Sequence, residues 1–479
     1  MLDDEANSKV LPIVLCIIHM NVVDKSNTTL HYLATAGLGS QSNAHVLFKH
    51  LENILHKFAM AAEEFAFWWT IAHVFTRRHG GDILLVQVYV DDIIFGSTNP
   101  DFSKRFANLM KNNFEMSMMG ELKFFLGLQV HQSPRGIFIS QSQYAIELLK
   151  KHGLDECVSM STPMATERLD ADLQGTPTDQ TTYRRMIGGL MYLTASRPDI
   201  AFATFVCARY QARPTVKHLK EVKRIFRYLR QSYNMGLWYP KDSGFELIAY
   251  SDADHAGCKD DCKSTSGGLQ FLGGKLVSWS SKKQDCTAMS TAEAEYVSLS
   301  ACCAQVIWMR TQLLDYGYKY NRIPMYCDSK SAIAISCNPV QHSKTKHIDI
   351  RYHFIKEHVE KGTVEIYFVG TEYQLADLFT KVLPKERFEY LVHRIGNFSS
   401  KTKISFSQTV ETASRLTSDA VTTTPVTGSH QPRRRQTPRL YLMRRSLEVL
   451  RKSHWMILGG RFNQLSHVSS PLLSKPGEY

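Results

Sequence analysis

Apolar residues in the central part of the chain alternate between the spacing of strands and the spacing of helices. Ile83–Val90 is an apolar and aromatic run with one Gln, a pattern typical of a strand buried on both faces. Ile93–Phe95 resumes the run after Asp91 and Asp92. We therefore predict a hairpin with two carboxylates at its tip.

Helical and strand patterns alternate over the next 60 residues. We predict a helix over Pro100–Phe114, strands over Leu122–Val130 and Ile137–Ser140, and a helix that ends near Leu149. This order indicates an α+β fold. A stretch containing Thr, Asp and Pro over 159–182 predicts a loose connection, and three helical segments follow it: Met186–Leu193, Asp199–Tyr210 and Val216–Arg230.

The last of these helices is rich in basic residues, which include Lys223 and Arg227. Such a helix face is commonly just solvated, and it can also follow a phosphate backbone. The pattern by itself favours the solvated face. The second interpretation makes Lys223 and Arg227 candidate contacts to nucleic acid.

From Phe245 to about Arg394 the order is strand, hairpin strands, long helix, strand, helices, strand and helix. This order predicts a mixed sheet with helices packed on it. Strand alternation over FELIAYSDAD places Asp252 at the end of an inner strand. A carboxylate in that position needs a partner.

The helix that begins near Ser290 offers such a partner. Ser290 and Glu293 fit a capping box, which gives Glu293 a structural role. Glu295 instead heads a stripe that is otherwise apolar: Leu299, Cys302, Val306, Met309 and Leu313. We therefore expect the Glu295 carboxylate to point toward the domain interior.

Two further acids stand in comparable places. Asp328 directly follows the predicted strand Ile323–Cys327, and Asp377 opens a helical segment in QLADLFTK. Each acid alone could cap a helix or close a strand. If Asp252, Glu295, Asp328 and Asp377 converge, they repel one another unless a cation lies among them. With no His or Cys in this set, Mg²⁺ or Mn²⁺ is expected rather than zinc.

Length and charge add to this interpretation. A chain of 479 residues, 43% of them hydrophobic and 21% charged, indicates several ordinary globular domains. The net charge is +12, but residues 401–479 hold 13 Lys or Arg against 4 Asp or Glu. Ser and Thr are frequent in the same segment. We therefore expect a basic, low-complexity and disordered tail over 400–479.

The start of the chain shows no export signal. The apolar stretch Val10–Met20 is shorter than a membrane span, and the residues before it are acidic. Ten cysteines without recurring spacing indicate reduced thiols. We expect an intracellular protein, in cytoplasm or nucleus, with no membrane contact and no small-molecule cofactor. The oligomeric state stays open.

Six segments in the C-terminal half carry a family resemblance: AYSDADHAG, STSGGLQFLGGKLVSWSSKKQ, STAEAEYVSL, MYCDSKSAI, KTKHIDIRYHFIKEHV and QLADLFTK. In this order they resemble the ribonuclease H domain of copia-type retrotransposon polyproteins. The resemblance implies that Asp252, Glu295, Asp328 and Asp377 hold two divalent ions and cut the RNA strand of an RNA/DNA hybrid. Two such ions stabilise the attacking and departing oxygens of phosphoryl displacement.

Several basic residues are candidate substrate contacts. Lys344, Lys346 and Arg351 lie in the KTKHIDIRYHF segment. His347 in the same segment could shuttle protons, although a lone His before a helix is more commonly structural. Asp254 is expected to be an accessory or solvent-facing acid.

QVYVDDIIFGS resembles the hairpin of a reverse transcriptase palm, and the following segments continue the copia-type pattern. The resemblance implies that Asp91 and Asp92 are palm metal ligands. Polymerisation needs a further Asp from an earlier strand, and Asp24 is the one faint candidate upstream. We therefore expect polymerase activity to be lost.

The predicted organisation is a multidomain α+β and α/β chain. Its parts are an unassigned start over 1–78, a partial palm over 79–158, a mostly helical connection over 159–240, a ribonuclease H-like mixed sheet with flanking helices over 245–395, and the tail. The leading hypothesis is a truncated copia-type polyprotein with ribonuclease H activity. The alternative is a non-catalytic nucleic-acid-binding remnant of a decayed element.

Overall fold

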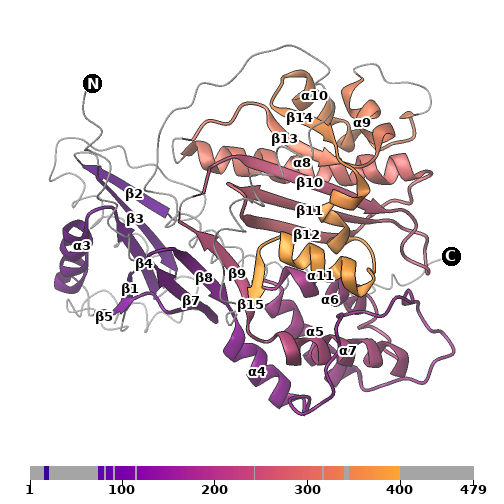
Figure 1. Cartoon of the computed structure of the whole chain (residues 1–479), viewed down its shortest axis with the longest axis horizontal. Coiled ribbons are helices and arrows are strands. Elements are labelled where there is room, and N and C mark those ends of the chain that lie inside the picture. Colours follow the sequence, from indigo (N-terminus) through magenta and orange to yellow (C-terminus); the bar gives the residue numbers. More distant parts are fainter. Residues whose placement is uncertain are drawn as a thin grey trace, which may run out of the picture.

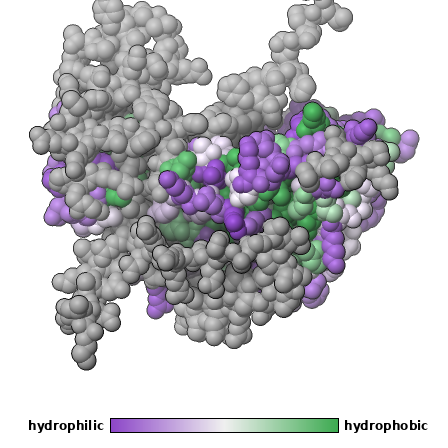
Figure 2. All heavy atoms as spheres, turned by 90° about the horizontal axis from the view of Figure 1, so that it is seen from above, coloured by the Kyte–Doolittle hydropathy of each residue, from purple (hydrophilic) through white to green (hydrophobic). Residues whose placement is uncertain are grey.

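The computed structural model describes residues 16–20, 74–79, 82–89, 92–113, 116–241, 243–315, 318–338 and 345–399 (Figure 1). This part of the chain is a mixed α/β structure with three five-stranded sheets. Hydrophilic and hydrophobic side chains are interspersed on the face seen in Figure 2, and hydrophilic ones gather near its centre. None of the helices described here is both long and apolar enough to cross a bilayer. The predicted tail over 400–479 lies outside the described residues.

The first sheet contains the predicted acidic hairpin. Its strands follow the spatial order β2 (Val74–His79), β3 (Asp82–Tyr89), β4 (Asp92–Ser97), β1 (Cys16–Met20) and β5 (Met116–Glu121). All neighbours are antiparallel, and Tyr89 pairs with Asp92 across the hairpin. Helix α3 (Pro100–Asn113) buries Phe102, Phe106 and Met110. The hairpin and the helix agree with the sequence, which predicted neither β1 nor β2.

The second sheet joins strands from distant parts of the chain. Its order is β15 (Asn397–Ser399), β9 (Met235–Pro240), β8 (Gly136–Ser140), β7 (Leu128–Ser133) and β6 (Phe124–Phe125). The strand predicted over Leu122–Val130 is wrong as a single element. Leu126 and Gly127 have φ angles of 48° and 78°, and this left-handed backbone makes a turn between β6 and β7.

Four helices lie below the third sheet in the view of Figure 1. They are α4 (Ser142–Lys151), α5 (Gln180–Leu193), α6 (Ala201–Ala208) and α7 (Val216–Ser232), with a 3₁₀ turn, η1 (Pro198–Ile200), before α6. Arg197 is buried here and makes two hydrogen bonds to Asp199, of 2.9 and 2.7 Å. This bidentate geometry compensates the burial of both charges.

The third sheet is mixed. Its order is β12 (Leu276–Lys283), β11 (Thr265–Leu272), β10 (Leu247–Asp254), β13 (Ile323–Cys327) and β14 (Val364–Phe368). The strands β10, β11 and β12 are antiparallel, whereas β13 runs parallel to both β10 and β14. The predicted mixed sheet is therefore present, with β10 at its centre.

Helical segments pack on both faces of the third sheet. They are α8 (Thr291–Asp315), α9 (Lys330–Cys337), η3 (Ile350–Tyr352), α10 (Phe354–Glu360), η4 (Thr371–Tyr373), η5 (Leu375–Phe379) and α11 (Lys385–Arg394). Neighbouring glycines of β11 show the two faces. Gly267 lies against Thr380 and Phe379, next to η5, whereas Gly268 faces Cys302 of α8. The sheet is thus enclosed between α8 and the η5 segment.

Candidate functional site

Two of the predicted acids lie where parallel strands end together. Strand β10 pairs with β13 through Ala249 with Met325 and Tyr250 with Tyr326. Asp252 comes two residues after this pairing, and Asp328 directly follows β13. The carboxyl ends of parallel neighbours share one edge of a sheet, which is a common place for ligand sites. Asp252 is almost fully buried, and Asp328 is half-buried.

The third acid comes from α8, as the stripe predicted. All five apolar members of the stripe are buried, and Glu295 is only 8% exposed. The Ala253 backbone N–H donates to the Glu295 carboxylate. The Glu295 Oε2 atom is buried and has no hydrogen-bond partner among the described residues. A buried carboxylate oxygen without a donor is costly, so this atom is a candidate ligand.

The fourth acid, Asp377, lies in η5, and two cations contact it. Lys381 Nζ is 2.8 Å from Asp377 Oδ1 and 3.4 Å from Asp252 Oδ2. Arg387 Nη2 is 3.2 Å from Asp377 Oδ2. The Thr380 hydroxyl donates to Asp252 Oδ2. Asp252 and Asp377 therefore form a pair with Lys381 between them.

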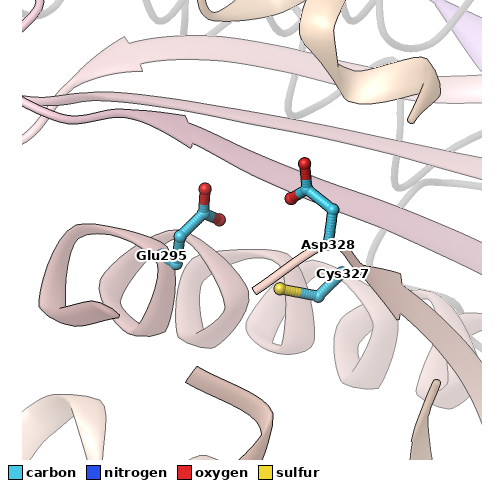
Figure 3. Close-up of side chains that lie close together, drawn as sticks. All are labelled: Glu295, Cys327 and Asp328. Atoms are coloured by element: carbon cyan, nitrogen blue, oxygen red, sulfur yellow. The ribbon is translucent and has the colours of Figure 1, made fainter. Parts of the chain in front are cut away.

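Glu295 and Asp328 form a second pair. One oxygen of each, together with the Cys327 sulfur, lies within 4.8 Å of the other two atoms (Figure 3). Both carboxylates point to the same side of the ribbon in that view. The Thr371 hydroxyl and the Gln374 amide hold Asp328, with distances of 3.1 and 3.4 Å.

The acids interact strongly across the two pairs. Burial raises the pKa of Asp252 to about 7, Lys381 opposes this shift, and Asp377 and Asp328 add to it. Burial also raises the pKa of Glu295 to about 9, with the charges of Asp252 and Asp328 acting in the same direction. Burial by itself would lower the pKa of Lys381, but Asp252 and Asp377 outweigh it and hold that pKa above its usual range.

This donor set fits hard divalent cations. Four carboxylates meet, one oxygen of Glu295 is buried without a partner, and one ammonium lies among them. Oxygen ligands of this kind suit Mg²⁺ and Mn²⁺, and a divalent ion favours the ionised form of acids that otherwise repel one another.

The predicted substrate contacts lie near one end of α8. Lys346 is exposed, and His347 Nε2 is 3.0 Å from Glu293 Oε2. The Glu293 N–H in turn bonds the Ser290 hydroxyl, so the predicted helix cap is present. Arg351 pairs with Asp349 and lies over the Tyr352 ring. Lys344 is outside the described residues.

The remaining candidate acids lie elsewhere in the structure or outside its described residues. Asp92 begins β4 in the first sheet, where it pairs with Tyr89 and with His19 of β1. Asp91 and Asp24 lie outside the described residues. Asp254, the expected accessory acid, accepts a hydrogen bond of 3.1 Å from Arg168. The structure therefore brings four carboxylates together in the third sheet and places Asp92 in another sheet.

Several basic residues of α7 bond to the protein itself. Arg224 donates to the Thr162 hydroxyl, Arg230 donates to the Asp155 carbonyl, and Lys217 pairs with Asp170. Lys223 is exposed, and Arg227 is half-buried. Binding of nucleic acid by these last two stays a prediction.

Sequence reasoning missed several residues that shape the site: Cys327, Thr371, Gln374, Thr380, Lys381 and Arg387. Some local signal exists. Lys381 stands four residues after Asp377, the spacing of a helical ion pair, and Cys327 directly precedes Asp328. The contacts of Lys381 and Thr380 with Asp252 join residues far apart in sequence, and a local pattern contains no information about them.

Comparison with known proteins identifies relatives of a large part of the chain. The sequence pattern of a family described as reverse transcriptase (RNA-dependent DNA polymerase) matches residues 23–166. The retrovirus-related Pol polyprotein from transposon RE1 of Arabidopsis thaliana is 38% identical over 325 residues, which are 67% of this chain and 22% of that protein. The chain thus spans about a fifth of that relative's length.

Two further matches are to shorter proteins, and each match covers most of the shorter protein. An uncharacterised mitochondrial protein of Arabidopsis thaliana is 33% identical over 225 residues, 47% of this chain and 94% of that protein. Among solved structures, the N-terminal ribonuclease H domain of a Mycobacterium tuberculosis protein matches with a TM-score of 0.22 and 10% identity. That match covers 31% of this chain and 98% of the solved one.

Proposed function

Since the chain belongs to the copia-type retrotransposon polyproteins, we propose that its third sheet is a ribonuclease H domain that hydrolyses the RNA strand of an RNA/DNA hybrid. The observation that carries this proposal is the meeting of Asp252, Glu295, Asp328 and Asp377. They come from two strand ends, one helix and one 3₁₀ turn.

The electrostatics support a metal-dependent reaction. The Asp252 and Glu295 carboxyls have pKa values raised to about 7 and about 9 in the absence of metal. Near neutral pH, both carboxyls therefore ionise less readily than an exposed carboxyl. A divalent cation bound between them would favour their ionised forms. The four acids would hold Mg²⁺ or Mn²⁺, two ions per site.

When bound, such ions polarise a phosphodiester and lower the pKa of a bound water. The protein's own part is orientation. The Thr380 hydroxyl and the Lys381 ammonium fix Asp252, the Gln374 amide fixes Asp328, and Arg387 fixes Asp377. Neighbours of this kind typically change metal affinity or activity by about 10- to 100-fold.

We further propose that the first sheet is a reverse transcriptase palm remnant without polymerase activity. Asp92, with Asp91 next to it in sequence, would be a metal ligand there. Two-metal polymerisation needs another carboxylate from a neighbouring strand. β1, which pairs with Asp92, reads CIIHM and contains no acid.

The test is a cleavage assay with the purified chain and an RNA/DNA hybrid in Mg²⁺. Wild type should cut the RNA strand and leave the DNA intact. Asp252→Asn should cut the RNA strand more than about 100-fold more slowly than wild type. This decrease corresponds to a loss of about 2.7 kcal/mol of transition-state stabilisation. Asp101→Asn, which changes an exposed acid of α3, is the matched control and should cut at the wild-type rate.

The outcomes separate the two hypotheses. Cutting that needs metal and Asp252 supports the nuclease. Hybrid binding without cutting, with an affinity that falls steeply with salt for every sequence, would overturn it in favour of the non-catalytic remnant.

A further inference from the structure

A thiol lies among the carboxylates of the site. Cys327 is the last residue of β13, directly before Asp328, and it is fully buried. Its sulfur lies within 4.8 Å of one oxygen of Glu295 and one of Asp328 (Figure 3). Mg²⁺ prefers oxygen ligands and so leaves this sulfur without a role.

The cluster contains a buried ligand atom with no other role. Glu295 is more than nine-tenths buried, and no described residue donates a hydrogen bond to its Oε2 atom. Figure 3 shows the Glu295 and Asp328 carboxylates pointing to the same side, with the Cys327 sulfur below them beside the helix that carries Glu295. A protein rarely leaves a buried carboxylate oxygen without a donor, so the position is suited to a cation.

Within the part of the chain that the structure describes, weak local hydrogen bonds are the ones that hold the Cys327 sulfur. It accepts from the Ser329 N–H at 3.4 Å, and its thiol donates to the Ser329 carbonyl at 3.9 Å. Sulfur hydrogen bonds are weak. Exchanging the thiol's bond for a metal–sulfur bond therefore costs little.

Ligand chemistry decides which ion takes this sulfur. Mg²⁺ and Mn²⁺ prefer oxygen, whereas Zn²⁺ binds thiolate, imidazole and carboxylate, commonly four-coordinate with three protein ligands and one open position. One thiolate and two carboxylates make such a three-ligand set.

We propose that Glu295, Cys327 and Asp328 form a Zn²⁺ site that overlaps the site for Mg²⁺. Zn²⁺ forms a bond to the Cys327 sulfur, and the thiol proton leaves to solvent. Because Glu295 and Asp328 are shared, the two kinds of ion exclude each other there. The consequence that Zn²⁺ inhibits cleavage rests on the proposed nuclease function, whereas the binding itself does not.

The thiol of Cys327 has to lose its proton before its sulfur can bind a metal ion. Burial and the Glu295 charge raise the pKa of Cys327 well above its usual range. Metal binding is then accompanied by proton release, as for other thiolate sites.

The experiment uses Co²⁺ as a spectroscopic probe for Zn²⁺ on the full chain. Wild type should take up Co²⁺ with a thiolate-to-metal charge-transfer band in the near ultraviolet, and Zn²⁺ should remove the band. Cys327→Ser keeps the size of the side chain and should weaken Zn²⁺ binding at least about tenfold with loss of the band.

Cys262→Ser is the matched control, because Cys262 is an exposed thiol open to non-specific metal binding. This variant should keep both the band and the affinity. If the band is missing in wild type, or equal in wild type and Cys327→Ser, the Zn²⁺ site does not exist.

A second variant covers a failure of Cys327→Ser to fold, which circular dichroism would detect. Asp328→Asn changes a half-buried ligand and leaves the thiol in place. It should weaken Zn²⁺ binding at least about tenfold, and unchanged binding would overturn the site.

Cleavage is then measured separately. A band without any nuclease activity refutes the nuclease and keeps the Zn²⁺ site. If Zn²⁺ saturates the site and the rate of Mg²⁺-dependent cleavage is unchanged, the overlap is wrong.

Discussion

Lys381 shares one ammonium between Asp252 and Asp377, at 3.4 and 2.8 Å. Arg387 adds a second cation on the far side of Asp377. These cations compensate one pair of acids, whereas no ion pair is present at Glu295 or Asp328 among the described residues. Burial, together with the charges of neighbouring acids, still raises the pKa values of both Asp252 and Glu295.

The raised pKa of Asp252 predicts how the metal-free protein responds to pH. Its ordinary value is 3.8, and burial raises it to about 7 in the folded state. The folded state then binds more protons than the unfolded state between these values, so stability falls as pH rises through this window. Asn carries no charge. In the presence of a chelator, the melting temperature of Asp252→Asn should exceed that of wild type. This difference should grow as the pH rises from about 5 to about 8.

Thermal unfolding at the two pH values measures this difference in melting temperature. Asp101→Asn is the control, because the Asp101 carboxylate is exposed. Added Mg²⁺ should stabilise wild type at pH 8 more than the Asn variant. If the difference in melting temperature between the two proteins is the same at pH 5 and pH 8, the Asp252 carboxylate does not carry the raised pKa that burial gives it.

Single residues differ in how far the sequence reveals them. The position of Glu295 followed from its place at the head of an apolar stripe, and its burial is confirmed. Lys381, Thr380 and Cys327 were missed, because their importance depends on side chains brought near by the sheet and not by local spacing.

Elements set the positions of these side chains, and the segment from Leu375 to Lys381 shows how. The sequence predicted a helical segment at Asp377, and the structure has the 3₁₀ turn η5 there. This segment packs closely on β11. A Cβ on Gly267 would lie 2.6 Å from Thr380 Cγ2 and 3.0 Å from the Ala376 carbonyl oxygen. Only a glycine allows this approach.

Gly267→Ala should therefore displace the segment that carries Asp377, Thr380 and Lys381. We expect a loss of about 1–3 kcal/mol in the free energy of unfolding, from overpacking, together with weaker Mn²⁺ binding. Urea unfolding and a Mn²⁺ titration measure the two effects.

The neighbouring residue supplies the control. A Cβ on Gly268 would lie 3.4 Å from Ser280 Oγ and 3.7 Å from Cys302, which are ordinary contacts. Gly268→Ala should keep wild-type Mn²⁺ affinity. Equal behaviour of the two variants would show that η5 does not position the acids.

Strand boundaries were less predictable than strand existence. The turn at Leu126 and Gly127 divides one predicted strand into β6 and β7, since a left-handed backbone does not alter the apolar pattern. β1 was missed because its strand conformation depends on pairing with β4 and β5, which are about 70 to 100 residues away in sequence.

At the scale of the whole molecule, a continuous cluster of buried apolar residues runs from Ile83 in the first sheet to Ile395 after α11. Polar contacts add to it near the site. Arg168 pairs with Asp254 at 3.1 Å, and Tyr210 donates to Asp260 at 2.9 Å. The helical connection is thus bound to the sheet that holds the acids.

The sequence predicted the order of elements over 245–395 and the four acids, through motifs and periodicity. It could not predict that β15 pairs with β9, which returns the end of the described chain to the second sheet. Such pairings are set by packing between distant segments, and local patterns do not encode them.

If the four acids are held together for divalent ions, the site should take up Mn²⁺ in solution. The most direct measurement is a titration of the full chain with Mn²⁺, in which electron paramagnetic resonance reports the free ion. Wild type should bind Mn²⁺, and added Mg²⁺ should displace the bound Mn²⁺. Asp252→Asn and Glu295→Gln should each weaken Mn²⁺ binding at least about tenfold. Uptake that is absent, or the same in all three proteins, would contradict this role of the four acids.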